Sequence, residues 1–152
     1  MKRNTIVRAF AIAAVTALAI SMTPTAKADD KGCSTAALKG TFAYTATGFL
    51  VAAPAPIGPY GSAGTQTFDG KGGTIVTGMT SANGNIAQQT NTGTYIVNSD
   101  CTGTFTLQIA PGVEAHFFFA IADNGNEYQA VCLDPVAVIT RVGRKLYPGR
   151  EI

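Results

Sequence analysis

Short segments of alternating apolar and polar residues, separated by turn-forming dipeptides, constrain the fold of this chain most strongly. Within residues 38–49, Phe42, Tyr44 and Ala46 share one face and threonines share the other. Residues 94–98 and 104–110 alternate in the same way. A period of two indicates strands with one covered face. The dipeptides that favour tight turns between such strands are Asp69-Gly70, Asn83-Gly84, Ser99-Asp100, Pro111-Gly112 and Asn124-Gly125.

The pattern predicts an all-β domain of about eight antiparallel strands, in which neighbours in sequence are neighbours in space. We favour an up-and-down β-barrel, because closure of the sheet leaves no open edge. A two-sheet β-sandwich is the alternative. Residues 115–122 are apolar on both faces and predict a central strand covered on both sides. Residues 127–133 and 136–142 predict two further strands.

One connection departs from the short turns. Residues 50–60 (LVAAPAPIGPY) contain three prolines and no polar side chain before Tyr60. Proline has no backbone N–H and is excluded from central strands. We therefore expect a long, apolar and semi-rigid loop here.

The N-terminus has the order of a secretory signal peptide. Lys2, Arg3 and Arg8 precede an uncharged run over residues 9–20, and Ala26-Lys27-Ala28 follows. The run is shorter than the roughly 20 residues that a membrane span needs. We predict a cleaved signal peptide over residues 1–28, an N-terminal segment over 29–37, the barrel domain over 38–146 and a tail over 147–152. The alternative for residues 1–28 is a buried N-terminal helix.

Cleavage would change the charge of the protein. It removes four of the eleven basic residues and none of the nine acidic ones, so the formal charge moves from +2 to −2. The remaining basic residues concentrate only near the C-terminus, which we interpret as a solvated tail containing Arg141, Arg144, Lys145 and Arg150. The sequence therefore predicts an exported protein, periplasmic or extracellular, with no membrane span after cleavage. It gives no electrostatic case for nucleic-acid binding.

The turns and strand starts carry a family resemblance. The segments 38–42 (LKGTF), 68–72 (FDGKG) and 93–104 (GTYIVNSDCTGT) resemble those of small exported bacterial proteins of uncharacterised function. The barrels of those proteins are similar to the barrels of allene oxide cyclases and calycins. The resemblance implies the same barrel fold and, because the cyclases handle apolar oxylipins, an apolar ligand. It brings no catalytic residue to this chain.

Three cysteines lie in the part of the chain that would be exported, where disulfides persist. We favour a Cys33–Cys101 bond, because cysteines at strand ends meet the geometry of a disulfide most readily. Other pairings stay open. Cys132 lies inside a predicted strand, where it is expected to be a buried small apolar residue. A reactive role for Cys132 lacks a basic neighbour in the sequence.

His116 is the only histidine, so a zinc site has no ligand set and any catalytic triad would have to use this residue. It shares a strand face with Phe118 and either points into the barrel or lies on the surface. Tyr44 and Tyr95 need a partner for the hydroxyl group if they are buried. We therefore nominate Tyr44, Tyr95, His116 and Phe118 as candidate ligand-binding residues. We nominate no catalytic residue, metal ligand or cofactor.

Aromatic residues otherwise predict a filled barrel, since the interior of eight strands holds side chains or one small ligand. The expected core comprises Phe42, Tyr44, Phe68, Tyr95, Phe105, Phe117, Phe118, Phe119 and Tyr128. Three functions fit this sequence. The first is a module that binds a small apolar molecule beneath a lid formed by residues 50–60. The second is a structural or protein-interaction module of the cell envelope, whose protein partner the sequence does not name. An isomerase-like or cyclase-like enzyme ranks last, because it rests on fold resemblance alone.

Overall fold

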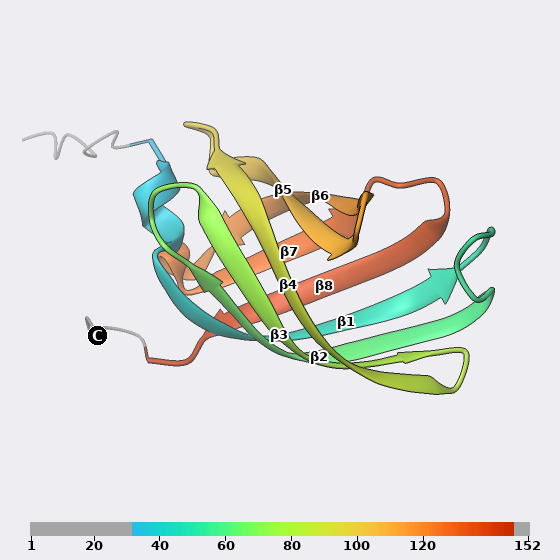
Figure 1. The fold of residues 1–152 in the computed structure, drawn as a ribbon. Coiled ribbons are helices and arrows are strands. Elements are labelled where there is room, and N and C mark those ends of the chain that lie inside the picture. The colour runs from blue at the N-terminus through green and yellow to red at the C-terminus, as the bar shows by residue number, and fades with distance from the viewer. Residues whose placement is uncertain (1–31, 148–152) are drawn as a thin grey trace, which may run out of the picture. The chain divides into compact units, whose positions relative to one another are not determined.

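Residues 32–147, which the computed structural model describes, form a closed antiparallel barrel in which each strand pairs with the next and β8 pairs with β1 (Figure 1). The predicted up-and-down barrel is therefore confirmed, and the sandwich is not formed. The predicted signal peptide and residues 148–152 of the predicted tail lie outside the described residues. The strands are β1 (Gly40–Leu50), β2 (Gly58–Phe68), β3 (Gly73–Ala82), β4 (Asn85–Val97), β5 (Thr102–Ala110), β6 (Val113–Ala122), β7 (Glu127–Cys132) and β8 (Ala137–Lys145).

The turns form where the sequence predicts them. Asn83 and Gly84 join β3 to β4, and both have positive φ, as a tight hairpin turn requires. Asp69 begins the turn between β2 and β3, and its carboxylate accepts hydrogen bonds from the backbone N–H groups of Lys71 and Gly73. These hydrogen bonds and the other contacts of its own loop hold the pKa of Asp69 below its usual value. Such local chemistry fixes the register of each hairpin.

Two details of the strands differ from the prediction. β6 is covered on one face only, because the outer face of a closed barrel meets no second layer, and Phe118 is 40% exposed. The proline-rich loop is also shorter than expected. β2 begins at Gly58 and includes Pro59, which pairs with Phe49 near the end of β1. Proline is tolerated there because it lies close to the start of the strand.

Aromatic side chains fill the half of the barrel that lies towards the N-terminus of β1. The centre of the Phe68 ring lies 4.9–6.5 Å from the centres of four other rings, those of Phe42, Tyr95, Phe105 and Tyr128. Gly143 faces the Tyr128 ring, and a β-carbon at Gly143 would overlap that ring. The predicted aromatic core is therefore confirmed except for Phe118, which points outward.

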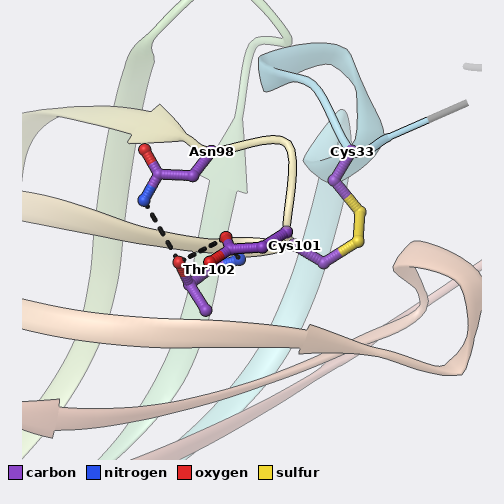
Figure 2. Close-up of a disulfide and its surroundings, with 5 residues drawn as sticks. Cys33, Asn98, Cys101 and Thr102 are labelled. Carbon is purple, nitrogen blue, oxygen red and sulfur yellow. Dashed lines mark hydrogen bonds between the residues drawn. A yellow bond between two sulfur atoms is a disulfide. The ribbon is translucent and has the colours of Figure 1, made fainter.

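A short 3-10 helix and a disulfide close this end of the barrel. η1 (Thr35–Leu38) places Leu38 in the core, fully buried. Figure 2 shows the disulfide between Cys33, beside η1, and Cys101, in the turn between β4 and β5. The Cα atoms of the two cysteines are 4.8 Å apart, so the predicted pairing is confirmed. The neighbouring backbone is tied as well, since the N–H of Cys33 donates to the carbonyl of Ser99.

The second 3-10 helix, η2 (Asp123–Gly125), forms the turn between β6 and β7. Across residues 32–147, no helix has the length and apolar character needed to cross a membrane.

Candidate functional site

A cavity of about 410 Å³ occupies the half of the barrel opposite η1. Its volume lies within the range of small-molecule sites, roughly 300–1,000 Å³. The proline-rich loop between β1 and β2 contributes Pro54, Ala55 and Pro56 to its lining, and this loop lies at the opposite end of the barrel from η1 (Figure 1). Most other lining residues are apolar, and they include Leu50, Leu107, Ile109, Ala115, Phe117, Val136, Ala137 and Ile139.

The cavity exists because small side chains occupy inward positions in this half of the barrel. Ala115 and Ala137 line the cavity on β6 and β8. Ala46 on β1 pairs with Arg141 on β8 and with Ser62 on β2, so two of the three inward positions at this level carry short side chains. The barrel is therefore filled at one end and hollow at the other.

Arg141 forms the floor of the cavity. The residue is only 4% exposed, although it lines the cavity. The guanidinium carbon lies 4.3 Å from the centre of the Tyr44 ring and 5.1 Å from that of Phe117. These distances fit cation–π contacts. Arg141 therefore separates the aromatic core from the cavity.

Two groups of hydrogen-bonded polar side chains lie near Arg141, one bonded to its guanidinium and the other to the hydroxyl of Tyr44. In the first, the carbonyl oxygen of Gln66 accepts a hydrogen bond from Arg141 Nη1 at 3.0 Å and one from the Tyr128 hydroxyl at 2.5 Å. The amide of Gln66 donates to Thr74 at 3.3 Å. Burial raises the pKa of Tyr128 well above its usual range, so this hydroxyl stays protonated and acts as a donor.

The second group connects the cavity wall to Tyr44. Asn91 donates to Gln89 at 3.1 Å, and Gln89 donates to the hydroxyl groups of Tyr44 and Ser62 at 2.8 and 2.9 Å. Asn91 and Gln89 line the cavity. This chain of hydrogen bonds satisfies the Tyr44 hydroxyl from within the protein and presents amide groups to the cavity.

The nominated ligand-binding residues do not form one site. Tyr44 lies beside the cavity floor, beneath Arg141. Tyr95 lies at the closed end, where its hydroxyl accepts from the N–H of Gly70 and donates to the carbonyl of Thr35. His116 and Phe118 are on the outer face of β6. None of these four residues lines the cavity, because the closure of the barrel turns the other face of β6 inward, η1 covers Tyr95 and Tyr44 is packed against Arg141.

His116 belongs instead to a polar group at the mouth of the cavity. Its ring Nδ1 lies 2.9 Å from Asp134 and its Nε2 lies 3.6 Å from Glu114. The thiol of Cys132 donates to Asp134 at 3.5 Å. Burial is the main reason that the pKa of this thiol is raised, so it is not poised as a thiolate. The thiol donates to the carboxylate rather than to the imidazole, and the negative charge of Asp134 further disfavours the thiolate.

Cys132 also differs from its predicted environment, since it is half-buried and lines the cavity. In the part of the chain that the structure describes, no three His, Cys, Asp or Glu side chains gather closely enough to hold a metal ion.

We predict that Asp134 makes the free energy of unfolding fall as the pH becomes acidic. Burial acts to raise the pKa of Asp134, but hydrogen bonds from the backbone and ring of His116 and from Cys132 outweigh it, and the pKa is lowered. A carboxylate whose folded pKa lies below its unfolded value stabilises the fold at neutral pH, and that stabilisation is lost as the pH falls below about 4. Asp134→Asn should lower the free energy of unfolding at pH 7 by about 1 kcal/mol. Urea denaturation should show the difference from wild type narrowing towards pH 3, and a difference independent of pH would contradict the assignment.

The residues that sequence reasoning missed are Arg141, Gln89 and Asn91. We expected Arg141 to be solvated with the other basic residues near the C-terminus, and the structure corrects this, because Arg141 lies on the inward face of β8 and is buried. A signal was present: Ala137, Ile139 and Arg141 alternate along one face of β8, so an arginine shares the apolar face. Gln89 and Asn91 lie in the first half of β4, where the sequence shows no apolar alternation.

The chain matches no protein-family model, no curated protein and no solved structure at a significant level.

Proposed function

We propose that this protein is an exported binding module that holds a small, largely apolar molecule in the open half of its barrel. The observation that carries the proposal is the 410 Å³ cavity with predominantly apolar walls and a few polar groups at its floor. Sites of this composition are typical of small-molecule binding. We include in this proposal the calycin-like or allene-oxide-cyclase-like barrel that the sequence resemblance implies, because a barrel of that kind would agree with a ligand inside it.

Export is supported by two independent features. The first 28 residues have the order of a secretory signal peptide. The Cys33–Cys101 bond is of a kind that persists in oxidising compartments and is rare in the cytosol. Periplasmic or extracellular locations both satisfy these features.

The proposal predicts that filling the cavity weakens binding. Ala115 lines the cavity, whereas Ala120 lies on the outer face of the same strand. Ala115→Phe should weaken the binding of the neutral apolar dye N-phenyl-1-naphthylamine by about tenfold or more, because the new ring occupies the volume that the dye needs. Ala120→Phe introduces the same ring on the opposite face and should leave binding unchanged. Fluorescence titration measures both variants, and a wild-type protein that does not bind the dye would overturn the proposal.

A second candidate function is contact with a partner protein through the apolar rim of the open end. The rim consists of exposed side chains from β1, β8 and their loops, namely Phe49, Val51, Ile57, Leu133 and Val138. Clustered exposed apolar residues often mark an interaction site. A Phe49→Ser, Val138→Ser double variant should then lose a partner that immobilised wild-type protein retains from envelope extracts, while dye binding persists. Equal retention by both proteins would exclude this role for the rim.

The enzyme hypothesis gains no support from the geometry. His116 lies outside the barrel, and the cavity floor carries an arginine and amide groups rather than an acid–base pair.

A further inference from the structure

The guanidinium of Arg141 is a buried cation without an anionic partner in the described part of the chain. Within residues 32–147, the contacts between basic and acidic side chains are those of Arg144 with Glu127 and of the His116 ring with Glu114 and with Asp134. Arg141 instead donates one hydrogen bond, to the neutral carbonyl of Gln66. Its Nε–H is buried and has no hydrogen-bond partner in residues 32–147.

The free-energy cost of burying the Arg141 charge is only partly compensated by its contacts. Burying an unpaired charge is unfavourable, and buried charges in proteins are normally paired or fully hydrogen-bonded. The rings of Tyr44 and Phe117 offset part of this cost through their negative faces. A guanidinium has five N–H donors arranged in a planar fork that matches a carboxylate. The floor of the cavity therefore has unused capacity to bind an anion.

We propose that the ligand of this cavity carries a carboxylate, which binds Arg141 while the apolar part of the ligand packs against Leu107 and Ile139. This inference rests on the proposed function and adds the chemical class of the ligand, an apolar monocarboxylate. The amide groups of Gln89 and Asn91 line the same cavity and supply further polar contacts for the head group.

The charges around the cavity favour a single negative charge on the ligand. Arg141 is the one lysine or arginine among the described residues that line the cavity. Glu114 and Asp134 lie at the mouth and are held there by His116. One cation at the floor neutralises one carboxylate. A phosphate dianion would keep an excess negative charge there, and the two carboxylates at the mouth would repel it more strongly than a monoanion.

Competition between two ligands of equal chain length tests the inference without any substitution. Decanoate and decanol differ in the head group only, and each is titrated against wild-type protein loaded with N-phenyl-1-naphthylamine. A charge-assisted hydrogen-bonded pair should make decanoate the stronger competitor by about tenfold or more at neutral pH. Equal competition, or a preference for decanol, would overturn the carboxylate assignment while dye binding itself still supports the proposed function. Failure of the dye to bind would overturn the proposed function.

Two variants on β8 assign the preference to Arg141. Arg141→Met keeps a long side chain without charge, and it should reduce the ratio of decanoate to decanol affinity to about one. Arg144→Gln is the matched control, because Arg144 is on the outer face and its side chain is 78% exposed. It should keep the wild-type ratio. A ratio that survives in Arg141→Met, or falls equally in Arg144→Gln, would contradict a role for Arg141, and the wild-type competition stands on its own if Arg141→Met does not fold.

Discussion

Replacing Phe68 with alanine should lower the free energy of unfolding by about 3–5 kcal/mol, the range found for large aromatic side chains removed from protein cores. Phe68 is 1% exposed and contacts rings from β1, β4, β5 and β7. Its removal leaves a cavity in the middle of the filled half of the barrel, where β-strands on all sides limit collapse. Chemical denaturation followed by circular dichroism measures the change.

The matched control is Phe49→Ala. Phe49 is also a phenylalanine in an adjacent strand, but its side chain is on the outer face and largely exposed. This variant should change the free energy of unfolding by about 1 kcal/mol or less. Similar losses for the two variants would show that Phe68 is not the centre of the core.

Removal of the disulfide should have the second-largest effect. The Cys33–Cys101 bond joins positions 68 residues apart, and it ties the segment that carries Leu38 into the core. A Cys33→Ser, Cys101→Ser double variant should lose about 2–4 kcal/mol, because the unfolded chain without the crosslink has more freedom. Wild-type protein denatured with a reductant present should lose a similar amount.

Cys132→Ser serves as the control for this experiment. Cys132 is a free thiol, so its variant should keep the reductant-sensitive stability of the wild type. If reductant had no effect on wild-type protein, or if Cys132→Ser removed the effect of reductant, the pairing of Cys33 with Cys101 would be contradicted.

The features that the sequence predicted are those encoded by local chemistry. Asn83-Gly84 prefers the backbone conformation of a hairpin turn regardless of its surroundings. Alternation in residues 38–49 placed Phe42, Tyr44 and Ala46 on one face, and all three are buried. Successive hairpins then leave few ways to arrange eight strands, which is why closure into a barrel could be expected.

The features that escaped prediction depend on which face of a strand becomes the interior. Residues 115–122 are apolar on both faces, so alternation could not show that Phe117 and Phe119 point inward while His116 and Phe118 point outward. Arg141 was missed for a related reason. An arginine near the C-terminus is usually solvated, and only the pairing of β8 with β1 places it beside Tyr44 inside the barrel.

The most direct measurement of the binding site is a crystal structure of the protein with decanoate. We expect the carboxylate within hydrogen-bond distance of the Arg141 guanidinium and the hydrocarbon chain along Leu107 and Ile139 beneath the loop between β1 and β2. Decanoate bound only on the outer face, or a cavity closed by the proline-rich loop with no ligand inside, would contradict a binding site in the open half of the barrel.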